Sequence, residues 1–244
     1  MRTDVLGVGF DNIAPEDAVK RAEELVAARK ASYIVTPNPE IIMMCSEDDR
    51  LLAAVNGADL VLADGIGVII GARILGDPLS RRIPGIDFAE ALIRRLSENS
   101  CGLFLLGARP KVAESAAEEL KKRYGGVRIC GSCDGYFSDD GAIKEKINET
   151  KPDMILVCLG APKQELWMSE NAGRLDAGIM IGLGGALDVF SGNVKRAPEG
   201  WRRLGLEWLY RLIGEPRRIK RAVKLPLFIF RVIAVRLRGK KDAR

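Results

Sequence analysis

The fold is decided by the segment Ala58-Asp-Leu-Val-Leu-Ala-Asp-Gly-Ile-Gly-Val-Ile-Ile-Gly71, in which a short apolar run ends at Asp64 and spaced glycines follow. An apolar run of this length that stops at an acid and a glycine predicts a buried strand, a tight turn and the start of a helix. In an open parallel sheet, ligands bind in the crevice beyond the carboxyl ends of the strands. We therefore expect Asp64 to lie at the mouth of a binding site.

Two other interpretations of this turn stay open. The glycines in Gly65-x-Gly67-x-x-x-Gly71 approach the dinucleotide-binding pattern G-x-G-x-x-G, but the third glycine is one residue late. The Asp64 carboxylate would also face the pyrophosphate, and no acid ends a following strand about 20 residues on to hold a ribose. Alternatively, Asp64 serves only as the N-cap of the next helix.

The amino-acid composition restricts the class of protein and the kinds of catalytic and metal site that the chain can form. The 244 residues, 47% apolar and 29% charged, suit a soluble globular protein of one large domain or two small ones. Histidine is absent, which excludes Ser-His-Asp and Cys-His relays and histidine-ligated zinc. Cys130-x-x-Cys133 has no second cysteine pair, so no zinc site is expected. Five cysteines, an odd number, and the lack of a signal peptide predict a reducing, cytoplasmic location.

Charge is distributed unevenly along the chain. Residues 195–244 contain 16 Lys or Arg and 4 Asp or Glu, a net charge of +12, whereas the whole chain carries only +5. An acidic body joined to a basic tail indicates a polyanionic partner, which can be nucleic acid, an anionic membrane or a phosphorylated substrate.

Apolar strand-like runs alternate with amphipathic helix patterns along the first 194 residues. Strands are expected at residues 5–10, 33–36, 58–63, 103–107, 127–130, 154–159 and 179–182. Near-continuous apolar strands that alternate with helices favour a mostly parallel sheet with helices on both faces, a Rossmann-like α/β fold. We predict an α/β catalytic domain over residues 1–194 and a basic, helical appendage over residues 195–244.

Polar residues and glycines follow four of the expected strands, and two adjacent arginines lie in the loop of residues 80–87. The candidate binding residues are Thr36, Asn38, Asp64, Gly65, Arg82, Lys163, Gln164, Gly184 and Gly185. Asn38 can also cap the helix that starts at Pro39. Lys163 stands at an expected helix N-terminus, a combination that favours phosphate. Glycine after a strand is common, but four such turns on one rim predict a binding cleft.

The tail has two apolar stripes. Residues 201–213 can form one amphipathic helix whose stripe of Trp201, Leu204, Trp208 and Leu212 packs on the core. Residues 225–235 are apolar except for Arg231, too short a stretch to cross a bilayer. Together with the basic run from residue 217, this stretch predicts a helix lying on anionic lipid. The residues expected to contact that lipid are Leu227, Phe228, Ile229 and Phe230.

Five ordered blocks cover nearly the whole chain. They are Thr36-Pro-Asn-Pro-Glu40, Ala63-Asp-Gly-x-Gly67, Arg82-x-Pro-Gly-x-Asp87, Gly160-x-Pro-Lys-Gln-Glu-x-Trp167, and a tail block of Arg196-Ala-Pro198, Gly205-Leu-Glu-Trp-Leu-Tyr-Arg-Leu212 and Glu215-Pro-x-Arg218. With these blocks the chain resembles the WecG/TagA/CpsF glycosyltransferases.

This resemblance implies an inverting transferase that needs no metal and no cofactor. It implies transfer of N-acetylmannosamine from UDP-N-acetylmannosamine to the 4-hydroxyl of N-acetylglucosamine on diphospho-undecaprenol, at the inner face of the cell membrane. Asp64 matches the family's general base, and Thr36, Asn38, Arg82 and Gln164 match its polar active-site residues. The arginines around residues 215–221 match a C-terminal appendage that closes the pocket. Arg211, Arg218 and Arg221 are the candidate substrate-binding residues of the tail, and Arg218 and Arg221 are expected to face the diphosphate.

Two other classes of function compete with sugar transfer. A nucleotide-dependent oxidoreductase is disfavoured by the late glycine and the misplaced acid. An adaptor that binds membrane or nucleic acid through the basic tail is the second rival, and nucleic acid is not expected because the aromatic residues follow helical stripes rather than a sheet face. The identity of the donor sugar, with N-acetylmannosaminuronic acid or a glucose-type donor as alternatives, and the formation of a homo-oligomer stay open.

Overall fold

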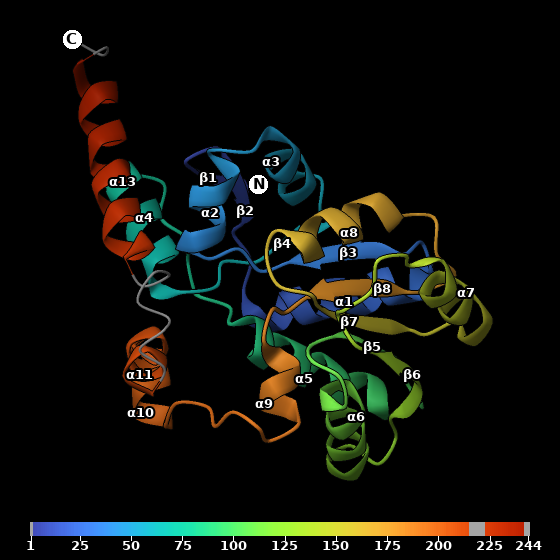
Figure 1. Ribbon diagram of the computed structural model, residues 1–244. Coiled ribbons are helices and arrows are strands. Elements are labelled where there is room, and N and C mark those ends of the chain that lie inside the picture. The colour runs from blue at the N-terminus through green and yellow to red at the C-terminus, as the bar shows by residue number, and fades with distance from the viewer. Residues whose placement is uncertain (1, 215–222, 242–244) are drawn as a thin grey trace.

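The structure, a computed structural model, describes residues 2–214 and 223–241 (Figure 1). A six-stranded sheet forms its centre, with the strand order β4-β3-β8-β7-β5-β6 and every neighbouring pair parallel. The strands are β3 (Ser32–Val35), β4 (Leu60–Val61), β5 (Gly102–Gly107), β6 (Arg128–Cys133), β7 (Met154–Cys158) and β8 (Ile179–Gly182). The predicted α/β fold is confirmed.

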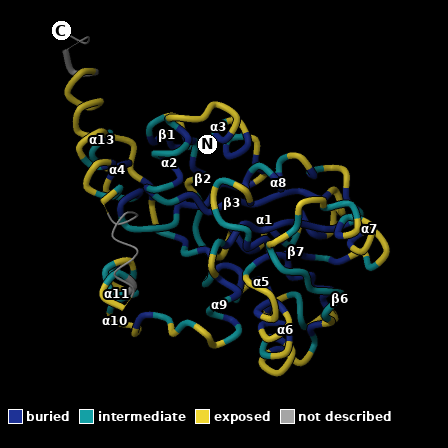
Figure 2. Tube along the Cα trace, in the orientation of Figure 1, coloured by how far each residue is buried: buried dark blue, intermediate teal, exposed yellow. Residues whose placement is uncertain are grey.

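Helices cover both faces of this sheet because its strands are apolar on both faces. In β7, Met154, Leu156 and Cys158 join one hydrophobic cluster, while Ile155 and Val157 join the other. The first face carries α1 (Pro15–Ala28), α5 (Gly85–Ser97), α6 (Val112–Arg123) and α9 (Ala186–Phe190). The second face carries α2 (Pro39–Cys45), α3 (Asp49–Asn56), α4 (Ile66–Leu75), α7 (Gly141–Thr150) and α8 (Lys163–Asn171). Strands β3, β4, β5, β7 and β8 are accordingly buried along their whole length, whereas the edge strand β6 is only partly buried (Figure 2).

The first apolar run of the sequence belongs to a β-hairpin, so the prediction of a single strand over residues 5–10 is wrong. Strands β1 (Arg2–Val5) and β2 (Val8–Asp11) pair antiparallel through a two-residue turn. Both turn residues, Leu6 and Gly7, have positive φ angles of 56° and 91°. Two positive φ angles in a two-residue loop are typical of the turn that matches the twist of a hairpin. The apolar residues on both sides of Gly7 conceal this turn in the sequence.

The segment predicted as one helix over residues 201–213 is divided. Helix α10 (Glu199–Arg203) ends before Gly205, and α11 (Glu207–Gly214) begins after it. Gly205 has a φ of +72°, the left-handed conformation that commonly follows a helix C-terminus. The predicted stripe is therefore broken, and Leu204 is 71% exposed rather than packed on the core.

Helix α13 (Lys224–Lys241) packs against α4 and α2 and extends beyond the body at its C-terminal end (Figure 1). Phe228 and Val232 are fully buried and belong to the hydrophobic cluster of the second face. The prediction that Phe228 contacts lipid is therefore wrong, whereas Leu227 and Phe230 are 52% and 71% exposed. The proposed division at residues 194 and 195 thus places part of the core in the appendage.

The spaced glycines of α4 leave room for α13 to pack closely against this helix. A Cβ on Gly67 would lie 2.5 Å from Leu225 Cδ1, and a Cβ on Gly71 would lie 2.8 Å from Phe228 Cζ. These contacts leave no room for a side chain on that face of α4. The near-match to a dinucleotide fingerprint is therefore explained by helix packing.

Candidate active site

A cavity of about 370 Å³ lies beyond the carboxyl ends of β3, β4, β7 and β8. One side, the sheet wall, consists of the turns that follow these four strands. It includes Thr36, Asn38, Asp64, Gly65, Gly160, Gln164, Gly184 and Gly185. The opposite side, the helical wall, comes from the chain after Pro198 and includes Gly205, Glu207, Trp208, Leu212 and Leu225. These four turns lie together on one rim of the sheet, as predicted.

Asp64 is half-buried in the turn between β4 and α4 and lines the cavity. Its backbone N–H donates to the carbonyl oxygen of Pro37, which ties the turns after β3 and β4 together (3.2 Å). Gly65, with a φ of +98°, is the N-cap residue of α4, and no side chain caps that helix. Asp64 is therefore not the N-cap, and the interpretation of its carboxylate as a cap is wrong.

Two polar side chains follow β3. The Thr36 hydroxyl donates to the carbonyl oxygen of Gly182 at the end of β8 (2.9 Å), so its own oxygen keeps acceptor capacity. Asn38 caps α2, as predicted, by accepting from the Ile41 N–H through Oδ1 (3.1 Å). Because Oδ1 is used for the cap, the amide nitrogen of Asn38 is the group left to donate toward a ligand.

Gln164 is buried at the start of α8 and joins two turns of the sheet wall. Its Oε1 accepts from the Gly184 N–H (2.9 Å), and its Nε2 donates to Glu165 Oε1 (2.8 Å). These two bonds fix which end of the amide faces which neighbour. Gly184 adopts a φ of +54°, and a Cβ on either Gly184 or Gly185 would meet no atom within 4 Å. A ligand can therefore approach this backbone closely.

Glu165 is a buried carboxyl group beneath the sheet wall. Its side chain is 1% exposed, and among the described residues its Oε2 has no hydrogen-bond partner. Burial raises the pKa of the Glu165 carboxyl, because desolvation penalises the charged form. The sequence contained no indication of this, since the residue stands in a polar helix start.

Arginines lie between the sheet wall and α10. Arg82, as predicted, lines the cavity, and its Nη2 donates to the carbonyl oxygen of Arg202 (2.7 Å). Arg196 also lines the cavity, and its Nη1 contacts Asp87 Oδ1 on α5 (2.7 Å). No role was predicted for Arg196, although it opens one of the sequence blocks. The two guanidinium groups make this part of the cavity suited to an anion.

Of the other predicted cations, Lys163 belongs to the described part of the chain, and it does not line the cavity. Lys163 donates to the carbonyl oxygen of Gly135 (3.0 Å) and lies 4.0 Å from the centre of the Phe137 ring. It is absent from the cavity lining, so its predicted role in phosphate binding has no geometric support. Arg211 belongs to α11, but its side chain is outside the described residues, as are Arg218 and Arg221.

Comparison with known proteins identifies a family and several relatives. Residues 3–242 match the glycosyl transferase WecG/TagA/CpsF family. A protein of Bacillus spizizenii is 38% identical over 204 residues, which cover 84% of this chain and 79% of the relative. A protein of Staphylococcus aureus MW2 is 35% identical over 243 residues, 98% of this chain and 95% of the relative. Both are named N-acetylglucosaminyldiphosphoundecaprenol N-acetyl-beta-D-mannosaminyltransferase.

Proposed function

The chain belongs to the WecG/TagA/CpsF glycosyltransferase family and is a glycosyltransferase, and on this premise we propose its reaction. It transfers N-acetylmannosamine from UDP-N-acetylmannosamine to the 4-hydroxyl of N-acetylglucosamine on diphospho-undecaprenol, with inversion at the sugar carbon. The observation that carries the proposal is the placing of Asp64 in one cavity with Arg82, Asn38 and Gln164. The names of the relatives support the choice of substrates.

Asp64 acts as the general base in this proposal. Inverting transfer requires one base that takes the proton of the acceptor hydroxyl as the hydroxyl oxygen attacks the sugar carbon. A nucleoside diphosphate leaves without needing a proton, so one carboxylate suffices. Because the turn after β4 is tied to Pro37 and to the helix start at Gly65, the carboxylate is held on a rigid element.

The remaining polar residues bind and neutralise the substrates. The amide nitrogens of Asn38 and Gln164 and the hydroxyl oxygen of Thr36 supply neutral hydrogen bonds, and the bare backbone of Gly184 and Gly185 admits the donor. Arg82 stabilises the negative charge that develops on the departing diphosphate. Arg218 and Arg221 keep the role that the family resemblance implies, closure of the pocket, and Arg211 stays a candidate substrate-binding residue.

We propose that this charge stabilisation needs no metal ion. The chain has no D-x-D pair, and within residues 2–214 and 223–241 no three acidic or cysteine side chains gather as metal ligands. Activity should therefore persist in EDTA. Strict dependence of turnover on added Mg²⁺ or Mn²⁺ would contradict this part of the proposal.

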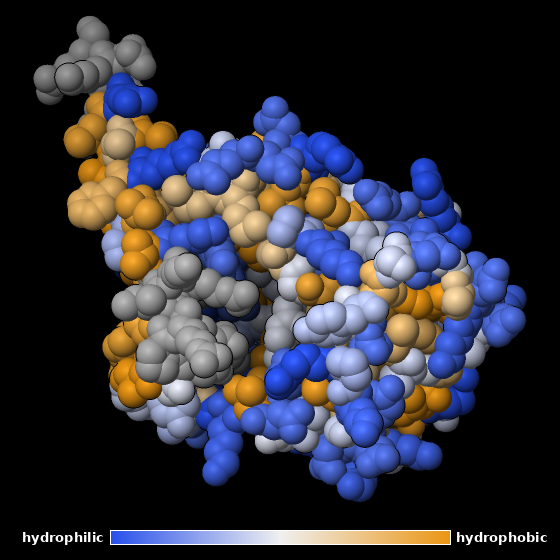
Figure 3. All heavy atoms as spheres, in the orientation of Figure 1, coloured by the Kyte–Doolittle hydropathy of each residue, from blue (hydrophilic) through white to orange (hydrophobic). Residues whose placement is uncertain are grey.

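The acceptor carries a lipid, and the structure offers a surface for it. Hydrophobic side chains line α13 and the neighbouring α11, including the exposed Leu227, Phe230 and Ile213 (Figure 3). None of the helices in the described part of the chain is long and apolar enough to cross a bilayer. We propose that this surface and the basic tail attach the enzyme to the inner face of the cell membrane.

The reaction is tested with a panel of UDP-sugars and a short-chain lipid-linked N-acetylglucosamine acceptor. We expect transfer from UDP-N-acetylmannosamine and little or none from UDP-glucose or UDP-N-acetylmannosaminuronic acid. Efficient transfer from one of the other donors would reassign the sugar but retain the reaction class. Thermal stabilisation by NAD(P) with none by UDP would instead favour the oxidoreductase.

A further inference from the structure

Arg196 lies in the loop between α9 and α10 and lines the cavity, and within the described part of the chain only Nη1 of its guanidinium is engaged. Nη1 contacts Asp87 Oδ1 at 2.7 Å and Glu90 Oε2 at 3.6 Å, both on α5. Nε and Nη2 are buried, and neither has a hydrogen-bond partner among the described residues. The side chain as a whole is 15% exposed.

Buried donors without partners are unusual in folded proteins, because their desolvation is not compensated. In a planar guanidinium, Nε and Nη2 present parallel N–H bonds along one edge, which matches two oxygens of a phosphate group. Asp87 holds the opposite part of the same group and so fixes the direction of that edge. Nε and Nη2 have almost no surface open to solvent in this structure, so a ligand in the cavity can bond to them only after the groups that cover this edge move aside.

The charged side chains around Arg196 determine which kind of ligand it can bind. Arg82 lies on the same wall, and Arg202 places its Nη1 3.6 Å from the Asp87 carboxylate that also holds Arg196. The acidic groups that face this cluster are Asp87, Glu90 and Glu207. Asp87 and Glu90 both contact Nη1 of Arg196, so the Nε–Nη2 edge is the part of this side chain that remains for an added anion.

We propose that the Nε–Nη2 edge of Arg196 binds a substrate diphosphate by two parallel hydrogen bonds. This inference rests on the proposed function, in which both substrates carry a diphosphate. Arg196 is then a binding residue supplied by the segment just after the sheet, in addition to Arg82 and to the arginines predicted further along the tail. Its anchoring by Asp87 links the first turn of α5 to substrate binding.

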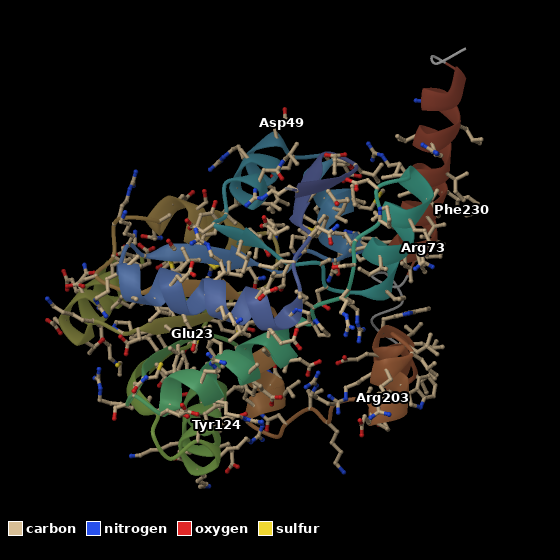
Figure 4. All side chains as sticks on the ribbon, turned by 180° about the vertical axis from the view of Figure 1, so that it is seen from behind. Glu23, Asp49, Arg73, Tyr124, Arg203 and Phe230 are labelled. Carbon is tan, nitrogen blue, oxygen red and sulfur yellow. The ribbon has the colours of Figure 1, made fainter. Side chains whose placement is uncertain are left out.

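The test compares Arg196→Lys with Arg203→Lys in the full chain. Lysine at position 196 keeps a cation opposite Asp87 but has no paired donors, whereas Arg203 is exposed on α10 and pairs with Glu199 (Figure 4). UDP and uridine, which lacks the diphosphate, are titrated against each variant, and KM is measured for the short-chain lipid-linked acceptor. Contact with the donor diphosphate predicts a loss of UDP affinity of at least tenfold with uridine binding unchanged. Contact with the acceptor diphosphate predicts at least a tenfold rise in acceptor KM with UDP affinity unchanged.

Asp87→Asn separates binding from a purely structural role. If Arg196 only joins its loop to α5, Arg196→Lys keeps a cation opposite Asp87 whereas Asp87→Asn removes the ion pair, so Asp87→Asn should impair binding at least as much as Arg196→Lys. Binding through the free edge predicts a larger loss for Arg196→Lys. Changes within twofold for both UDP affinity and acceptor KM, or equal losses in the two variants, would overturn the inference. Because the titrations need no transfer, an inactive wild-type enzyme would refute the proposed reaction separately.

Discussion

The sheet wall is held by the parallel ladder and by short bonds beneath it, such as Thr36 to Gly182 and Gln164 to Gly184. The helical wall is held against the body by contacts between segments distant in sequence: Arg82 donates to the carbonyl oxygen of Arg202, Gly205 lies against Ile66, and the buried Phe228 docks α13. A residue of the first wall is thus positioned by the sheet itself, whereas the second wall depends on contacts between segments that are distant in sequence. In the function proposed above, the chemistry is assigned to the sheet wall, and enclosure and attachment are assigned to the helical wall.

The largest expected effect belongs to the sheet wall. Asp64→Asn should lower turnover by about 10²- to 10⁴-fold, because a positioned base is lost while the shape of the side chain is kept. The melting temperature should change little, since the turn is fixed by backbone bonds of Asp64 and by Gly65. Steady-state kinetics and thermal unfolding of the purified variant measure both quantities. Near-normal turnover would remove Asp64 from the mechanism.

Phe228→Ala should differ from Asp64→Asn in that its main effect is a lower free energy of unfolding. Phe228 is fully buried against Gly71, and truncation of a buried phenylalanine costs about 3–5 kcal/mol. Phe230→Ala, two residues along the same helix and 71% exposed, is the matched control, with an expected change within about 0.5 kcal/mol. Urea denaturation measures the difference. Equal, small losses in the two variants would show that α13 is not part of the core.

Attachment to lipid should depend on the outer face of α13, with an effect smaller than that of Phe228→Ala on stability. The double change Leu227→Ser and Phe230→Ser should weaken binding to phosphatidylglycerol vesicles by about tenfold, since each side chain contributes by burying apolar area. Tyr136→Ser alters a side chain of similar exposure, 73%, in the loop before α7 and should bind as the wild type does. Cosedimentation measures the binding. An equal loss for Tyr136→Ser would show that the outer face of α13 has no special role.

The sheet wall could be predicted from sequence because each of its turns follows a local rule. An apolar run followed by glycine or an N-cap residue places Asn38, Asp64 and Gly184 on one rim without knowledge of any distant contact. The failures involve partners that are remote in sequence. Gly67 and Gly71 resemble a nucleotide loop until α13 is seen to fill the space beside them.

Side-chain direction was the other quantity that sequence could not supply. Lys163 and Gln164 are adjacent, yet one turns to Phe137 and the other lines the cavity. The unpartnered edge of Arg196 and the burial of Glu165 likewise depend on neighbours from α5 and from the second face of the sheet. Residue type and spacing identify such groups only as polar.

The smallest expected effect concerns Glu165, which supports the sheet wall from beneath. Burial raises the pKa of this carboxyl above its ordinary value of 4.5, so the folded protein holds the proton more tightly than the unfolded chain does. The unfolding free energy therefore falls as pH rises from about 4.5 through the folded-state pKa, by about 1.4 kcal/mol for each tenfold difference in proton affinity.

Glu165→Gln removes this dependence, because glutamine does not titrate. Relative to the wild type, the variant should gain stability between pH 5 and pH 8, and the direction of the gain is the expected result. Glu170→Gln on the same helix, where Glu170 is exposed and faces Arg50, is the control and should show no such gain. Urea denaturation of the three proteins at both pH values measures the differences. An equal gain by Glu170→Gln would mean that the pH dependence does not arise from the burial of Glu165. A loss of stability by Glu165→Gln relative to the wild type as pH rises would mean that the buried carboxyl is stabilised in its charged form and that the sheet wall rests on an ion rather than on a neutral acid.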